Sequence, residues 1–150
     1  MTPPAPELDP LRPGPLERPL TLDGPRMRAL GHSTVDAIVD MAMERGIDGI
    51  VATNTTIART GLTTDPARVV ALGPGGLSGA PLRDKSLALL ARIHDRIRRE
   101  PRAPTLVGVG GIATAEDAWQ RIVHGATLLE LYTSFIYEGP LVAHRIHEGL

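Results

Sequence analysis

The segment from Pro104 to Ala115, PTLVGVGGIATA, constrains the fold of this chain more than any other stretch. A short apolar run rich in valine lies between a proline and a group of glycines, which is typical of a buried strand. Thr114 then stands where a helix N-cap is expected, and Asp117 follows at the spacing of a capping box. The segment therefore predicts a strand that runs through a glycine turn into a helix.

The turn of this segment contains Gly110 and Gly111. A junction of this kind directs backbone N–H groups toward one point near the positive end of a helix dipole, so it can bind a phosphate. Glycine is expected there because a Cβ atom would block the close approach of the anion. A plain strand-to-helix turn of an α/β protein explains the same residues without a ligand, and the segment alone leaves both interpretations open.

Length and composition exclude several classes of protein. The chain has 150 residues, enough for one domain with one core, and its net charge of −1 gives no electrostatic basis for binding nucleic acid. It has no cysteine, which excludes disulfides, thiolate metal sites and thiol nucleophiles. No stretch approaches the ~20 apolar residues of a membrane span, and the first residues lack the pattern of a signal peptide. We therefore expect a cytoplasmic protein.

Residues 1–30 differ in composition from the rest of the chain. Prolines crowd this window, and no apolar periodicity accompanies them. Because each proline removes a backbone donor and disfavours helix at the preceding residue, we expect a mostly disordered arm. A proline-motif ligand for a partner domain is an alternative interpretation. The expected organisation is an arm over 1–30 and one folded domain over 31–150.

Helical and strand patterns alternate through the rest of the chain. Helices are predicted at 33–45, 84–99, 115–124 and 141–147, strands at 47–53, 105–109 and 127–132, and loops at 54–79 and 133–140. Such alternation predicts an α/β fold with a parallel sheet and right-handed crossovers. Ligands of these sheets bind at the carboxyl ends of the strands, where the polar and glycine residues of this chain gather.

Several further side chains are assigned to ordinary structural roles. Trp119 lies on the apolar stripe of the predicted helix 115–124 and is expected in the core. His144 and His147 are three residues apart, but no cysteine or carboxylate pattern joins them, so we expect both to be solvated. We identify no metal site and no catalytic residue in the sequence.

Four motifs resemble the C-terminal part of dihydroorotate dehydrogenase, with the best fit to the quinone-dependent class 2 branch. They occur in the order and at the spacing of that family and extend over about residues 33–150. The motifs are DGIVATNTT at 48–56, GGLSGAPL at 75–82, GVGGI at 108–112 and YTSFIYEGP at 132–140.

This resemblance implies both a fold and an activity. The family fold is an eight-stranded (β/α) TIM barrel that carries FMN, and the chain is similar to about its last three βα units. A full barrel needs about 250 residues. The enzymes oxidise dihydroorotate to orotate in pyrimidine biosynthesis: a base removes a proton, hydride passes to the flavin, and quinone reoxidises it. The implied protein is an FMN-dependent oxidoreductase with dihydroorotate, orotate and quinone as partners.

The resemblance also implies roles for individual residues. Asn54 and Thr55 are the predicted substrate-binding residues, because an amide can both donate to and accept from the edge of orotate. The predicted cofactor-binding residues are Thr53, Ser78, Gly79, Gly110, Gly111, Tyr132 and Thr133. Of these, the glycine turn, Tyr132 and Thr133 are assigned to the phosphate and the others to the flavin. Asn54 could instead serve only to cap a turn.

Departures from the family pattern qualify the predicted activity. Lys85 is the only lysine, and it lies in a later segment than the flavin-contacting lysine of the family. The segment with the serine base has no counterpart, and neither Ser86 nor Ser134 matches its motif.

We therefore expect an inactive portion of the enzyme, from a truncated or split gene, to which a further chain supplies the missing strands. The alternatives are a non-catalytic phosphate- or flavin-binding module and part of another FMN-dependent barrel oxidoreductase. The full-length family also implies peripheral membrane association, through a segment that has no match here.

Overall fold

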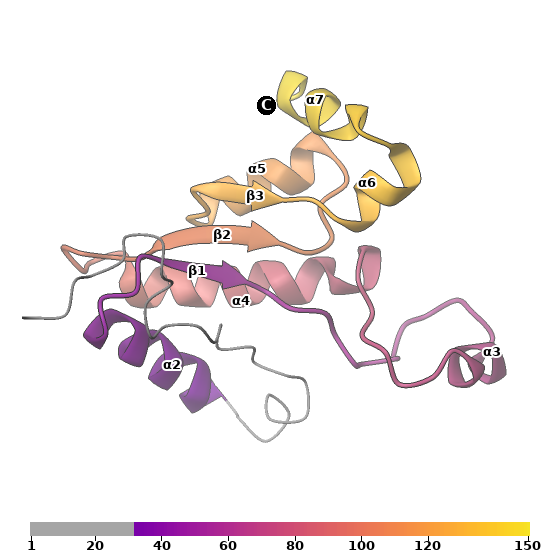
Figure 1. The fold of residues 1–150 in the computed structure, drawn as a ribbon, viewed down its shortest axis with the longest axis horizontal. Helices are drawn as coiled ribbons and strands as arrows, with labels where there is room; N and C mark the ends of the chain where they lie inside the picture. Colours follow the sequence, from indigo (N-terminus) through magenta and orange to yellow (C-terminus); the bar gives the residue numbers. More distant parts are fainter. Residues whose placement is uncertain (1–31) are drawn as a thin grey trace, which may run out of the picture.

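The fold is centred on a parallel sheet of three strands. A computed structural model describes residues 32–150, and their side chains from Val35 onward; the predicted arm over 1–30 lies outside the described residues. The strands are β1 (Gly49–Ala52), β2 (Thr105–Val109) and β3 (Leu128–Glu130), in the spatial order β1-β2-β3. All three point the same way, so their carboxyl ends meet at one edge of the sheet (Figure 1).

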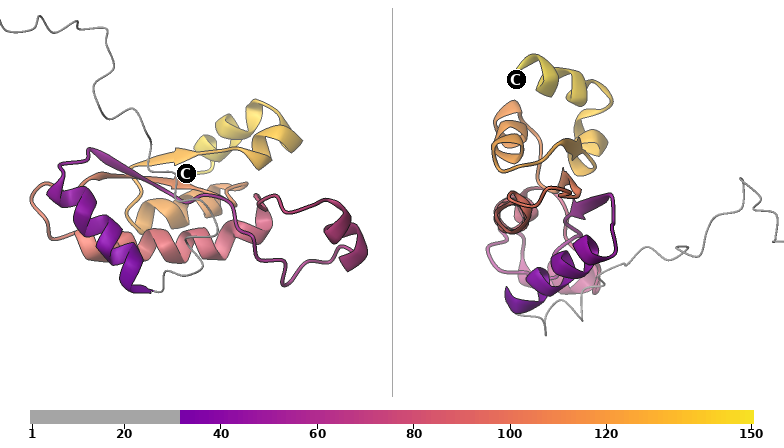
Figure 2. Two further views of the ribbon diagram at one scale, coloured as in Figure 1. Left: turned by 60° about the horizontal axis from the view of Figure 1, so that its bottom comes forward. Right: turned by 90° about the vertical axis from the view of Figure 1, so that its left-hand side faces the viewer.

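Helices connect the strands and cover one face of the sheet. The helices involved are α2 (His32–Glu44), α4 (Arg83–Ile97) and α5 (Ala115–Val123). Helix α4 packs against both β1 and β2, α2 packs against α4, and α5 packs against β3. Figure 2 shows α4 and α5 on the same side of the sheet. The predicted α/β class with parallel strands and crossover helices is therefore confirmed.

Strand alternation separates a covered face of the sheet from an open one. Ala52 and Leu106 are buried on the helical side, where they join Val39, Leu90 and other residues in the main apolar core. Val51 and Leu128 point the other way and are 57% and 58% exposed. The register pairs Val51 with Val107 and Val107 with Leu128, so the open face carries a continuous apolar row.

Two short helices occur where loops were expected. Helix α3 (Pro66–Ala71) lies within the predicted loop 54–79, and α6 (Thr133–Glu138) replaces the predicted loop 133–140. Helix α3 forms locally, because the Asp65 side chain accepts from the N–H groups of Ala67 and Arg68 and a proline occupies the first turn. Both helices have six residues, too few to show the apolar periodicity on which the sequence prediction relied.

Helix α5 presents a different face to the protein from the one predicted. Trp119 is 49% exposed, and Val123 is 48% exposed, so the expectation that Trp119 is a core residue is wrong. The buried residues of the helix are instead Asp117, Ala118 and Arg121. The apolar stripe was misleading because the inward face bonds to the glycine turn and needs polar groups there.

The C-terminal helix α7 (Leu141–Glu148) packs on α5 and α6 through Val142 and Ile146. His144 and His147 are exposed, as predicted. Over residues 32–150 no group of histidine and carboxylate side chains is arranged to hold a metal ion. Within the same range no helix has the length and apolar character needed to cross a bilayer.

Candidate functional site

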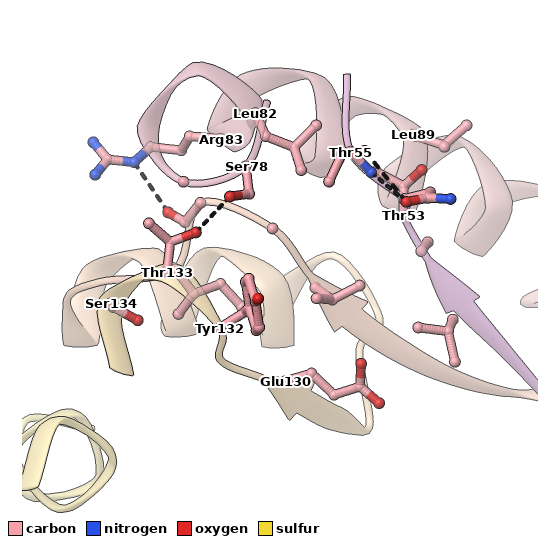
Figure 3. Close-up of a pocket in the computed structure, with 18 of the residues that line it drawn as sticks. Thr53, Thr55, Ser78, Leu82, Arg83, Leu89, Glu130, Tyr132, Thr133 and Ser134 are labelled. Atoms are coloured by element: carbon pink, nitrogen blue, oxygen red, sulfur yellow. Dashed lines mark hydrogen bonds between the residues drawn. The ribbon is translucent and has the colours of Figure 1, made fainter. Parts of the chain in front are cut away.

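A pocket of about 760 Å³ lies at the carboxyl ends of the three strands. Every residue predicted to contact substrate or cofactor lines it, and Figure 3 shows several of them. The set is Thr53, Asn54, Thr55, Ser78, Gly79, Gly110, Gly111, Tyr132 and Thr133. Their roles remain predictions, but segments as far apart as residues 53 and 133 do meet at one cavity.

The end of β1 positions the predicted substrate-binding residues. The N–H of Thr53 donates to the carbonyl of Val109 at 3.2 Å, which extends the pairing of β1 with β2 by one residue. The side-chain oxygen of Asn54 accepts from the N–H of Thr55 at 2.7 Å. Asn54 therefore makes the local hydrogen bond that is expected of a residue that caps a turn. Its side-chain NH₂ group donates to no residue in the described part of the chain, so it is available to a ligand.

The two ends of the long loop after β1 pair with each other beside the pocket. Thr56 and Leu77 form an antiparallel bridge, with N–H···O distances of 3.0 and 2.7 Å. A Cβ on Gly76 would lie 1.9 Å from Oγ1 of Thr55, so only glycine fits at this crossing. Lys85 contacts Oγ1 of Thr56 at 3.5 Å, outside the pocket lining. This pairing brings Thr55 and Ser78 to the same cavity although some twenty residues separate them.

The glycine turn after β2 has both of its carbonyl groups bonded to the protein. Gly110 and Gly111 adopt φ angles of +105° and +72°. The carbonyl of Gly110 accepts from Oγ of Ser86 at 2.7 Å and from Nη2 of Arg121 at 2.8 Å. The carbonyl of Gly111 accepts from Nε of Arg83 at 3.3 Å. Among the described residues, the N–H groups of Gly111 and Ile112 find no protein acceptor.

The reason for glycine at this turn differs from the one expected. A Cβ on Gly111 would lie 2.4 Å from Cα of Arg83, and a Cβ on Gly110 would lie 2.7 Å from Cδ2 of Leu82. Both missing side chains would point into the protein and not toward an approaching anion. The expectation that glycine makes room for the anion is therefore wrong; close packing against the start of α4, together with positive φ, requires it.

The predicted capping box at the start of α5 is confirmed, and it changes the expected source of donors. Oδ2 of Asp117 accepts from the N–H groups of Ala113 and Thr114 at 3.0 Å each, while Oγ1 of Thr114 accepts from the N–H of Asp117. A carboxylate thus already occupies the positive end of the α5 dipole. The donors left for a ligand are those of the glycine turn itself.

The end of β3 completes the pocket. Tyr132 precedes α6 with a largely exposed ring, and Oγ1 of Thr133 donates to Oγ of Ser78 at 2.8 Å (Figure 3). Ser134 is one of the residues that line the pocket, and its hydroxyl is buried without a hydrogen-bond partner among the described residues. Barrel enzymes frequently form phosphate sites from the loops after strands 7 and 8 and a short extra helix.

Sequence reasoning missed charged groups of the pocket. Arg83 lines it and pairs its Nε with Oδ1 of Asp117 at 3.0 Å; Glu130 and Glu138 line it as well. A signal for Arg83 was present, because a basic residue in the first turn of a helix opposes the dipole and is therefore unusual. Arg121 was missed too. Burial lowers the pKa of its guanidinium, and the charge of Asp117 opposes this effect.

Parallel strands, crossover helices on one face and a pocket at the carboxyl ends define a section of an α/β domain of the barrel or doubly wound kind. The family model described as dihydroorotate dehydrogenase matches residues 29–150. The chain belongs to the dihydroorotate dehydrogenase family.

Relatives and solved structures agree with this assignment. The chain is 53% identical to the dihydroorotate dehydrogenase (quinone) of Thermobifida fusca over 81% of its own length and 31% of the relative's. It is 54% identical to the enzyme of that name from Rhodococcus erythropolis, with 81% and 33% covered. A crystal structure of ligand-free DHODH from Eimeria tenella superposes with a TM-score of 0.68 at 37% identity, over 80% of this chain and 32% of that one. The chain thus spans about a third of the length of these relatives.

Proposed function

We propose that this chain forms the phosphate-binding side of an FMN-dependent dihydroorotate dehydrogenase, in which dihydroorotate is oxidised to orotate and a quinone accepts the electrons. The observation that carries the proposal is the pocket: every residue predicted from the family motifs lines it, from the ends of three neighbouring strands and from the loop before α4. Family membership and the name shared by the relatives support the choice of reaction.

The residues present fit the phosphate end of FMN. Two adjacent N–H groups, those of Gly111 and Ile112, have no protein acceptor among the described residues, and the buried hydroxyl of Ser134 has no partner. Donors without a protein acceptor are free to bond to a ligand, and each hydrogen bond to a charged group contributes about 1.5–3 kcal/mol. Gly111, Ser134, Tyr132 and Thr133 would hold the phosphate. When bound, FMN would supply the acceptor for the hydride of the substrate.

The other half of the pocket would bind the flavin ring and the substrate. Ser78 and Gly79 lie on the segment that the Thr133 bond fixes, and they would line the ring. Asn54 and Thr55 lie at the end of β1, and the free NH₂ group of Asn54 would donate to a carbonyl of orotate. These side chains bind and orient; none of them is positioned as a base.

A non-catalytic flavin- or phosphate-binding module is the second candidate. The observation in its favour is that the pocket lining contains no lysine, and Lys85 contacts Thr56 outside it. Co-expressing this chain with the N-terminal two thirds of a relative separates the candidates. Restored oxidation of dihydroorotate supports the enzyme, whereas a stable complex that binds FMN without activity supports the module.

Flavin titration of the 150-residue chain tests the proposal itself. FMN and riboflavin share the ring and differ in the phosphate, so the ratio of their dissociation constants measures how much the phosphate-binding groups contribute to affinity. One or more charge-assisted hydrogen bonds to the phosphate predict that FMN binds at least about tenfold more tightly. Fluorescence quenching measures both constants. Equal affinity, or no binding of either flavin, would contradict the proposal.

A further inference from the structure

Arg121 is a buried cation directly behind the glycine turn, and the family motifs do not include it. It projects from the inward face of α5 and is 1% exposed. Its Nη2 donates to the carbonyls of Gly110 and Arg83, at 2.8 and 2.9 Å, and to Oγ of Ser86 at 2.9 Å. A single guanidinium nitrogen thus ties the turn after β2 to the first turn of α4.

The strand below makes room for this side chain. A Cβ on Gly108 would lie 3.3 Å from both Cβ and Cγ of Arg121, so the missing side chain of the strand lets the aliphatic stem pass across β2. The stem can therefore reach the end of the strand while its charged head stays buried. The missing side chain of Gly108 thus leaves space for Arg121, whereas the glycines at 110 and 111 are required by the backbone of the turn.

The carbonyl bonds determine where the N–H groups of the turn point. The peptide between Gly110 and Gly111 is trans, so its carbonyl and the N–H of Gly111 point in opposite directions. Arg121 and Ser86 hold this carbonyl toward the helices. The N–H of Gly111 must then point away from them, toward the pocket that Gly111 lines.

We propose that Arg121, together with Ser86, is a positioning residue for the phosphate of the flavin cofactor. By fixing the carbonyl of Gly110 behind the turn, the pair aims the N–H of Gly111 at the bound phosphate without touching the ligand. This inference rests on the proposed function, because it presupposes that a phosphate binds at the turn. Burying a charge costs free energy that an apolar side chain of similar volume avoids, so a purely structural position would not require arginine.

Substitution of Arg121 distinguishes positioning from general stability. Arg121→Met keeps much of the volume and removes every hydrogen bond. We expect the ratio of riboflavin to FMN dissociation constants to fall from about tenfold to near one, with riboflavin affinity unchanged. Arg121→Lys keeps a buried donor and should retain part of the ratio. Arg92→Met is the matched control: it breaks the ion pair of 2.8 Å that joins α4 to Asp36 of α2, and it should leave the ratio intact.

The outcomes separate the inference from the proposed function. If the unmodified chain does not prefer FMN, the proposed function fails and takes the inference with it. If the unmodified chain prefers FMN and Arg121→Met keeps the preference, or weakens both flavins in parallel, only the inference is wrong. Should Arg121→Met not fold, Ser86→Ala decides, because it removes one of the two bonds to the carbonyl of Gly110. A reduced ratio at constant riboflavin affinity supports positioning, and an unchanged ratio overturns it.

Discussion

Thr133 and Ser78 are joined by a hydrogen bond of 2.8 Å across 55 residues of sequence. The bond links the first residue of α6 to the loop that precedes α4, and so connects two of the walls of the pocket. A Cβ on the neighbouring Gly79 would lie 2.9 Å from Cγ2 of Thr133. This contact couples local packing to the geometry of the site.

Gly79→Ala should therefore destabilise the protein more than backbone strain alone explains. Thr133 can make room only by rotating, which would move its hydroxyl off Ser78. Gly61→Ala is the matched control, because Gly61 has a similar φ of +78° but nothing within 4 Å of an added Cβ. We expect Gly79→Ala to cost about 1 kcal/mol more than Gly61→Ala in urea unfolding at a fixed protein concentration. Equal costs would contradict the contact.

Gly111→Ala should act on folding first and on binding only as a consequence. An added Cβ would lie 2.4 Å from Cα of Arg83, and a backbone atom cannot rotate away. Gly73, with a φ of +82° and open space around it, offers the control. The urea midpoint of Gly111→Ala should correspond to a loss of about 2–3 kcal/mol beyond that of Gly73→Ala. A fully stable variant that merely loses FMN would restore the view that the glycine clears a path for the anion.

Ser134→Ala should change stability and affinity in opposite directions. Without ligand the Ser134 hydroxyl is a buried group with no partner among the described residues, so its removal should raise the free energy of unfolding by up to about 1 kcal/mol. If the hydroxyl donates to the phosphate, FMN should bind several-fold more weakly while riboflavin binding stays the same. Fluorescence titration of both flavins measures this. An unchanged FMN affinity would show that Ser134 does not bind the phosphate.

The open face of the sheet should drive self-association of the isolated chain. Val51 and Leu128 are more than half exposed in one row of this face, on either side of Val107. Within residues 32–150, β1 and β3 each have one edge without a partner strand. Sedimentation velocity should show association that rises with concentration, and the double substitution Val51→Lys and Leu128→Lys should reduce it. Val70→Lys is the control, since Val70 is 79% exposed on α3, away from the sheet (Figure 1). A chain that stays monomeric at all concentrations contradicts this prediction.

The isolated chain should not turn over dihydroorotate. Catalysis by this class needs a positioned base as well as the flavin, and neither Ser86 nor Ser134 of this sequence matches the motif of the family's serine base. Purified chain with FMN, dihydroorotate and a quinone analogue should give no rate above that of free flavin. A full-length relative assayed alongside provides the positive control. Turnover by the chain would require a base among the residues described here.

The sequence was sufficient to predict what depends on local pattern. The alternation of apolar runs, the capping box of Thr114 and Asp117, and the parallel arrangement of the strands followed from residue spacing and were confirmed. Since parallel strands share one carboxyl edge, motifs placed after each strand were bound to approach one another. The short helices α3 and α6 escaped prediction because six residues cannot display a helical period.

Only the tertiary structure decided which face of α5 is buried and why the turn needs glycine. Trp119 lies outward and Arg121 lies inward. The buried guanidinium of Arg121 is stabilised by hydrogen bonds to the carbonyls of Gly110 and Arg83, which belong to other elements of the fold. In the same way, the Cβ that Gly111 lacks would strike Arg83, a residue 28 positions away. Spacing along the chain records neither relationship, since both arise when α4 and α5 pack together behind the end of β2.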